Sequence, residues 1–136
     1  MEGADDPAAS TSPVTRAAHA ACADFLGQFK MAMQLGHFAF VRRPQYLQDL
    51  MELGLTVQNA KTIINDLTVS NCCAGPEPDD YAPAVDVWMF GYGERAKAAY
   101  IKLRLMPIAN SAIVQAQVWS FHKARFTLKY PFRESR

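Results

Sequence analysis

The sequence has few cysteines, no long apolar run and almost no net charge. Its 136 residues hold three cysteines, Cys22, Cys72 and Cys73, an odd number without a CxxC spacing. This set argues against a disulfide framework and offers none of the usual spacings of a zinc site. No window approaches the roughly 18 uninterrupted apolar residues of a membrane span. The sequence therefore predicts a protein of the reducing cytoplasm, without a metal ion or other cofactor and with no membrane partner.

The N-terminal stretch lacks the features of a targeting signal. Glu2, Asp5 and Asp6 stand where a secretory signal would carry positive charge. Residues 1–20 are rich in Ala, Ser, Thr, Pro and Asp and show no apolar periodicity, so we expect a flexible tail there. Residues 21–136 are long enough for one domain with a modest core.

Charge is unevenly distributed along the chain. Residues 94–136 carry nine Lys or Arg and two acids, a formal charge of +7, whereas residues 1–93 carry five cations and eleven acids, a formal charge of −6. The C-terminal part is therefore expected to bind an anionic partner. The alternative is that the two parts neutralise each other across the fold.

Helical patterns come first in the sequence and strand patterns follow. Apolar residues at helical spacing predict helices over residues 21–35, 44–54 and 56–67, with Gly54 as a stop and Thr56 as an N-cap. "NCCAGPEPDDYAP" reads as a loop. Alternating patterns then predict strands in "VDVWMFGY", "AAYIKLRLM" and "AIVQAQVWSFH". The order predicts an α+β fold with N-terminal helices packed on a small antiparallel sheet.

Strand alternation predicts which side chains share a face of the sheet. Ile101, Leu103 and Leu105 would face the core, which leaves Tyr100, Lys102 and Arg104 on the other face. If Trp119 and Phe121 also face the core, His122 emerges beside Tyr100 and Lys102. A slip of one residue in the strand register would reverse this arrangement.

A face with His, Tyr and Lys suits RNA cleavage through the 2′-hydroxyl. This reaction needs a base, an acid and positive charge near the phosphorus, and side chains can supply all three. We therefore predict His122, Tyr100 and Lys102 as catalytic residues. The further cations of this part are predicted to contact RNA: Arg104, Lys123, Arg125, Lys129 and Arg133. The alternative is an ordinary solvated strand face with an exposed histidine at its edge.

Four segments resemble, in order, those of the MqsR-type toxins of bacterial type II toxin–antitoxin systems. They are "DLMELGLTVQNAKTIINDLTVSNCCAGPEPD", "VDVWMFG", "AYIKLRL" and "SFHKARFTLKYPFR". Members of that family often read D-L-x-x-L-G, D-x-W-x-F-G, V-Y-I-K-L and S-F-H-x-A-E. The resemblance covers about residues 25 to 133 and leaves out only the N-terminal tail.

The resemblance implies a RelE-like microbial RNase fold and a single toxin-like RNase domain over residues 21–136. It also implies an mRNA endonuclease, often ribosome-bound, with a cognate antitoxin protein as its partner and DNA contacted only through that antitoxin. Tyr100 and Lys102 match the family's "VYIK" positions, and His122 follows Ser-Phe at a catalytic position.

The chain also departs from the family pattern. Met89 stands where the best-known branch has glutamine, Arg125 replaces the acid of "HxAE", and the loop before the first strand has no cation. These departures motivate the alternative of a non-catalytic RNA- or protein-binding relative. A third hypothesis is a regulatory protein whose acidic helical part docks another protein.

Overall fold

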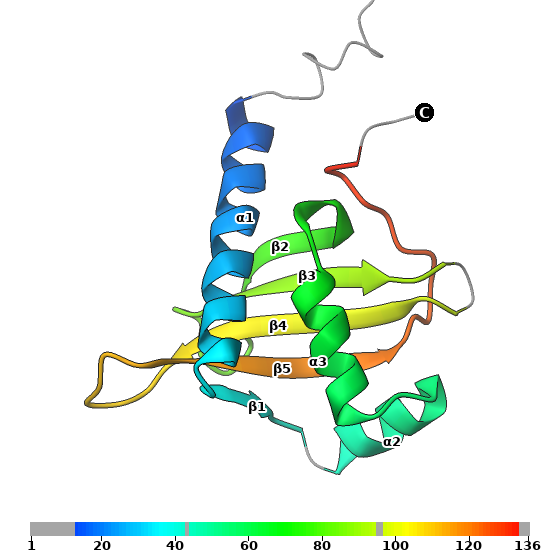
Figure 1. The fold of residues 1–136 in the computed structure, drawn as a ribbon. Helices are drawn as coiled ribbons and strands as arrows, with labels where there is room; N and C mark the ends of the chain where they lie inside the picture. Colours follow the sequence, from blue (N-terminus) through cyan, green and yellow to red (C-terminus); the bar gives the residue numbers. More distant parts are fainter. Residues whose placement is uncertain (1–12, 43, 95–96, 134–136) are drawn as a thin grey trace, which may run out of the picture.

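The computed structural model describes residues 13–42, 44–94 and 97–133 and shows an α+β fold (Figure 1). Helices and one short strand come first: α1 (Pro13–Gln34), β1 (Phe38–Phe40), α2 (Gln45–Leu53), α3 (Val57–Asp66) and the 3-10 turn η1 (Val69–Asn71). Four strands follow: β2 (Cys72–Pro78), β3 (Asp86–Tyr92), β4 (Ala99–Pro107) and β5 (Val114–Lys123). The three predicted strands correspond to β3, β4 and β5.

The predicted ends of α2 and α3 are confirmed. Gly54 closes α2 with a left-handed backbone at φ 71°, and its N–H donates to the carbonyls of Leu50 and Met51. Thr56 caps α3, because its hydroxyl accepts the N–H of Asn59 while the Asn59 side chain accepts the N–H of Thr56.

The first helix begins earlier than its apolar spacing predicts. It starts at Pro13 instead of Ala21, so residues 13–20 belong to α1 and not to a tail. Proline suits the first turn of a helix, and alanine, which recurs in this stretch, has the highest helix propensity. The tail predicted for residues 1–12 lies outside the described residues.

The predicted antiparallel pairing is confirmed for β3 to β5, but the additional strand β1 makes the sheet mixed. Its order is β1-β5-β4-β3-β2, and β1 runs parallel to β5 while the other neighbours are antiparallel. With three residues, β1 is too short to show an alternating pattern. The sequence prediction therefore misses this edge strand, which lies between the first two predicted helices.

The prediction of a loop at "NCCAGPEPDDYAP" is also wrong for residues 72–78, which form β2. This strand contains two register shifts against β3, so its side chains do not alternate regularly. Gly75 has a φ of 130° and packs so closely on Trp88 that a Cβ there would lie 2.8 Å from the ring. Glycine, two prolines and bulges together give the sequence the appearance of a loop.

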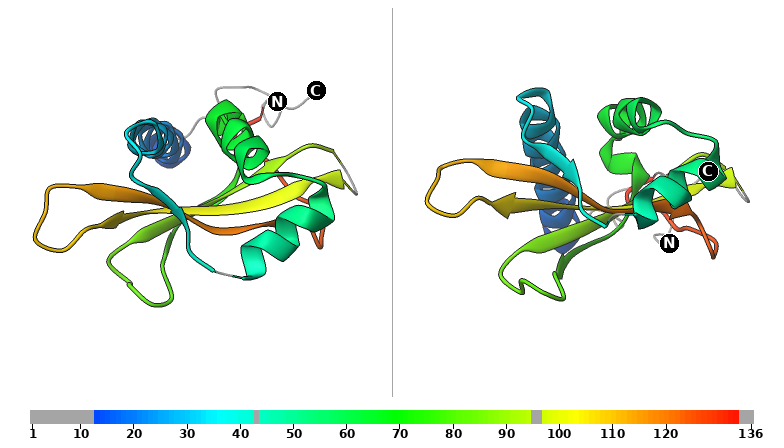
Figure 2. Two further views of the ribbon diagram at one scale, coloured as in Figure 1. Left: turned by 60° about the horizontal axis from the view of Figure 1, so that its bottom comes forward. Right: turned by 90° about the horizontal axis from the view of Figure 1, so that it is seen from below.

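The hydrophobic core lies between the sheet and two helices. α1 and α3 cover one face of the sheet, while α2 packs against β5 at the β1 edge (Figures 1 and 2). Fully buried Phe29, Ile64, Phe90, Ile101 and Phe121 fill this layer. Within the described part of the chain, every helix is too short or too polar to cross a membrane.

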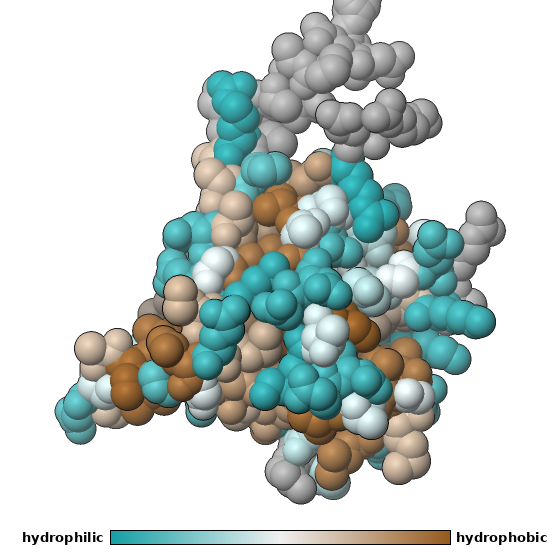
Figure 3. All heavy atoms as spheres, in the orientation of Figure 1, coloured by the Kyte–Doolittle hydropathy of each residue, from teal (hydrophilic) through white to brown (hydrophobic). Residues whose placement is uncertain are grey.

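The surface on the helical side is mostly polar over α3. Apolar surface is concentrated toward the tip of the β4–β5 hairpin, at the lower left of Figure 3. Ile113 near that tip, Met31 on α1 and Leu35 just after α1 are exposed and line an apolar groove. The sheet face opposite α1 and α3, called the outer face below, carries the residues predicted for the site.

A bulge places Trp119 differently from the prediction. Leu103 pairs with Val118 and Lys102 pairs with Ser120, so Trp119 is an extra residue in β5. Its ring lies 4.6 Å from the Arg104 guanidinium, on the outer face, and not in the core beside Phe121. The alternation is restored at Phe121, so the predicted outward position of His122 is correct.

Candidate active site

Tyr100 and His122 are direct neighbours on the outer face. They are paired residues of β4 and β5, and their ring centroids lie 5.2 Å apart at an angle of 30°. Ile101 and Phe121, the next pair, point into the core on the other side. Lys102 and Ser120 form the following pair on the outer face. The structure thus brings the three predicted catalytic residues to one surface.

Hydrogen bonds orient the His122 ring. Its Nδ1 lies 2.8 Å from the carbonyl oxygen of Lys123, and a carbonyl can only accept, so Nδ1 carries the proton. In the neutral ring Nε2 is then the unprotonated nitrogen. Arg125 Nη1 approaches Nε2 to 3.4 Å. His122 therefore presents a proton acceptor next to a fixed positive charge.

Tyr100 is held as a protonated hydroxyl. Burial raises its pKa above the ordinary value of tyrosine, and the negative charge of Glu77 raises the pKa further. Both effects disfavour the phenolate. Tyr100 is therefore a hydrogen-bond donor throughout the neutral range, which suits contact with a phosphate oxygen.

A groove of about 400 Å³ opens beside Tyr100. Its walls come from β2, β3, β4 and the C-terminal segment, which we define as residues 124–133. The lining residues are Cys73, Ala74, Glu77, Met89, Tyr100, Phe126, Thr127, Leu128 and Lys129. Phe126 is exposed and its ring lies 6.1 Å from that of Tyr100, so the groove has an aromatic rim.

The C-terminal segment is fastened across β3. Gly91 has no side chain, and Leu128 and Tyr130 occupy the space that a Cβ would need. Arg133 Nε donates to the carbonyl of Ser70 at 2.8 Å, and its guanidinium lies 3.7 Å above the Tyr130 ring. These contacts hold the wall of the groove that carries Lys129.

Four of the five cations predicted to contact RNA are exposed, and the fifth, Arg104, is buried. Lys123, Arg125, Lys129 and Arg133 are exposed at the end of β5 and along the C-terminal segment, where Arg125 approaches His122 and Lys129 lines the groove. Arg133 combines this exposure with its structural contacts to Ser70 and Tyr130.

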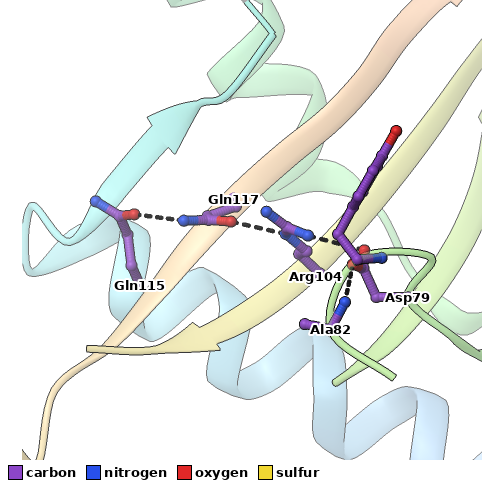
Figure 4. Close-up of polar contacts among 6 residues, drawn as sticks. Asp79, Ala82, Arg104, Gln115 and Gln117 are labelled. Atoms are coloured by element: carbon purple, nitrogen blue, oxygen red, sulfur yellow. Dashed lines mark hydrogen bonds and ion pairs between the residues drawn. The ribbon is translucent and has the colours of Figure 1, made fainter. Parts of the chain in front are cut away.

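Arg104 does not belong with the exposed cations, which corrects the prediction for this residue. It is buried, with Nη1 2.8 Å from Asp79 Oδ1 and Nε 2.7 Å from Gln117 Oε1 (Figure 4). A charge that is paired and hydrogen-bonded in the interior is not available to a phosphate. Alternation predicts the face of Arg104 correctly, but no local pattern indicates that the loop after β2 covers this residue with Asp79.

The structure adds residues that sequence reasoning missed. Glu77 and Cys73 reach the groove from β2, which was read as a loop. Burial raises the pKa of Cys73 to about 11 despite the nearby charge of Arg133, so its thiol stays protonated at neutral pH and is a poor nucleophile. Phe126 belongs to no periodic element, so no sequence pattern singles it out.

Neither a group of metal-ligating side chains among the described residues nor a similar protein of known function helps to assign a role to this site. Within residues 13–42, 44–94 and 97–133, no three His, Cys, Asp or Glu side chains are grouped so that they could hold a metal ion. Comparisons with protein-family models, curated proteins and solved structures found no match to this chain.

Proposed function

We propose that this protein is an endoribonuclease that cleaves mRNA at the outer face of its sheet. The observation that carries the proposal is the pairing of Tyr100 with His122 beside a groove that Lys129 lines. A half-buried histidine acceptor, a protonated tyrosine and nearby Lys and Arg are the groups that phosphodiester cleavage through a 2′-hydroxyl requires.

Each residue has a role in the proposed reaction. His122 Nε2 takes the proton of the 2′-hydroxyl, and the 2′ oxygen forms a bond to phosphorus. As the bond from phosphorus to the 5′ oxygen breaks, Lys102 gives a proton to that leaving oxygen. Tyr100 and Arg125 stabilise the negative charge on the other phosphate oxygens. The products are a 2′,3′-cyclic phosphate and a free 5′-hydroxyl.

The resemblance to MqsR-type toxins supports the biological part of the proposal. A toxin of that kind acts in the cytoplasm, on free or ribosome-bound mRNA, and is held inactive by a cognate antitoxin protein. The RelE-like fold is part of this proposal. An α+β fold with a sheet face open to RNA is compatible with it.

The experiment is expression and in vitro cleavage with His122→Ala and Tyr100→Phe. We expect each variant to relieve growth arrest and to slow cleavage by about 100-fold or more, the usual loss for a proton-transfer group or a charge-stabilising donor. His37→Ala is the matched control, because His37 is half-buried like His122 and lies between α1 and β1. Wild-type rates in both site variants would contradict the assignment.

A non-catalytic RNA-binding relative is the second candidate. The burial of Arg104 favours it, since one predicted cation is withdrawn from the surface. This candidate predicts salt-sensitive RNA binding without cleavage. Detection of 2′,3′-cyclic phosphate ends, produced by the wild type and lost in His122→Ala, would exclude it.

A further inference from the structure

The outer face carries a second aromatic cluster at a distance from His122. Tyr81, in the loop between β2 and β3, is 79% exposed, and its ring lies 5.7 Å from that of Trp119. The Arg104 guanidinium lies 4.6 Å from the Trp119 ring centroid, and that of Arg42 lies 5.5 Å from it. Arg104, Trp119 and Tyr81 thus form layers from the sheet to the surface.

The loop that carries Tyr81 is held in place by a buried network. The Asp79 carboxylate accepts the N–H groups of Tyr81 and Ala82, each at 2.9 Å, and is ion-paired with Arg104 (Figure 4). Arg104 is held in turn by Gln117 at 2.7 Å. Asp79, Arg104 and Gln117 therefore hold the loop that presents one exposed aromatic ring, although exposing that ring gains nothing for folding.

The cluster lies in line with the proposed cleavage site. Arg104, which underlies Trp119, is four residues from Tyr100 on β4, roughly 13 Å at about 3.3 Å per residue. Lys102 lies between them on the same face. A polynucleotide extended along β4 and β5 would pass from His122 over Lys102 to Tyr81.

We infer that Tyr81 and Trp119 form a base-stacking subsite for single-stranded RNA. This inference rests on the proposed function and extends it to the substrate, which must offer an unpaired base a short way along the strand from the cleaved bond. Aromatic rings bind any base through its flat face, and Arg42 and Lys102 supply charge for the adjacent phosphates.

The charges of the loop indicate how the RNA would be oriented in the subsite. Asp79 is neutralised by Arg104, but the adjacent Asp80 is exposed. A carboxylate repels phosphate and accepts hydrogen bonds from the amino groups of bases. The base is therefore assigned to the loop, and the phosphates are assigned to the side of Arg42 and Lys102.

The test compares a dinucleotide, which spans only the cleaved bond, with a single-stranded octanucleotide. Tyr81→Leu is expected to weaken binding of a 2′-O-methyl octanucleotide about 5- to 150-fold, the equivalent of roughly 1–3 kcal/mol for one stacked base. It should leave kcat/KM for the dinucleotide unchanged. Tyr81→Phe should bind like the wild type, because it keeps the ring.

Two further measurements accompany the binding assay. RNA should quench the fluorescence of half-buried Trp119, and Trp119→Phe should remove the quenched component, since Trp88 is 3% exposed in the core. Met31→Ala on α1 is the control, as its side chain is 56% exposed on the opposite side of the sheet. It should change neither assay.

The outcomes separate this inference from the proposed function. An unchanged affinity in Tyr81→Leu, equal losses for the dinucleotide and the octanucleotide, or equal binding of double-stranded RNA would overturn the subsite. So would a protein ligand that requires Tyr81 while RNA binding does not. If the wild type binds the octanucleotide through Tyr81 but cleaves nothing, the subsite stands and the proposed nuclease activity fails.

Discussion

At the scale of single residues, the same kind of side chain has opposite uses on one face. Arg125 is exposed and approaches His122 Nε2, whereas Arg104 is buried and neutralised by Asp79. Both are positive charges on an outward strand or segment. Their surroundings, and not their residue type, make Arg125 a candidate contact for RNA and Arg104 a structural residue.

The Asp79–Arg104 pair gives a prediction for stability. Arg104→Met should lower the free energy of unfolding by about 3–5 kcal/mol, because it leaves the Asp79 carboxylate buried without its partner. The double change Arg104→Met with Asp79→Asn should cost less than the two single changes together. Urea unfolding of the four proteins measures this, and strict additivity would contradict a coupled pair.

The pair also predicts how stability depends on pH. Burial alone would raise the pKa of Asp79, but hydrogen bonds from Tyr81, Arg104 and Ala82 and the charge of Arg104 outweigh it and lower the pKa. A lowered pKa stabilises the fold above the unfolded value of about 3.9, and this contribution is lost as pH falls through the folded value. The stability difference between the wild type and Asp79→Asn should therefore shrink below about pH 4.

At the scale of elements, the C-terminal segment makes the site by packing on β3. Gly91→Ala should displace Leu128 and Tyr130, because the added methyl group has no room. We expect slower RNA cleavage, since the wall that carries Lys129 would move from Tyr100. Kinetics of the purified variant measure the effect.

Gly27→Ala is the control for that change. Gly27 lies within α1 with nothing within 4 Å of its added Cβ, so alanine should stabilise the helix by about 0.5–1 kcal/mol and leave cleavage unaltered. Wild-type cleavage by Gly91→Ala would show that the segment does not shape the site.

At the scale of the whole molecule, the cations of the C-terminal part should determine the salt dependence of RNA binding. Each Lys or Arg that contacts a phosphate of single-stranded RNA contributes about 0.7 to the slope of log affinity against log salt. Lys129→Ala and Arg125→Ala should each reduce the slope by about that amount. Lys61→Ala should not, because Lys61 lies on α3 above the Phe38 ring. Equal slopes in all variants would place RNA elsewhere.

The sequence alone determined much of this protein. Local signals specified Gly54 and Thr56 as the ends of α2 and α3, and regular alternation in β4 set Tyr100 and Lys102 on the outer face. Such signals depend only on residues that are close in the sequence, so each can be recognised without knowledge of the tertiary structure. They were sufficient for the α+β class and for placing Phe121 in the core with His122 on the opposite face of β5.

Only the tertiary structure decided the rest. The bulge that turns Trp119 outward arises from pairing between two strands, and the burial of Arg104 depends on Asp79, which is 25 residues away in the sequence. β1 and β2 become strands through their neighbours in the sheet, since their own patterns are too short or too irregular. The groove and the Tyr81 cluster are made by segments that meet only after folding. The local sequence pattern of one such segment carries no information about the other, so their contacts cannot be predicted from either.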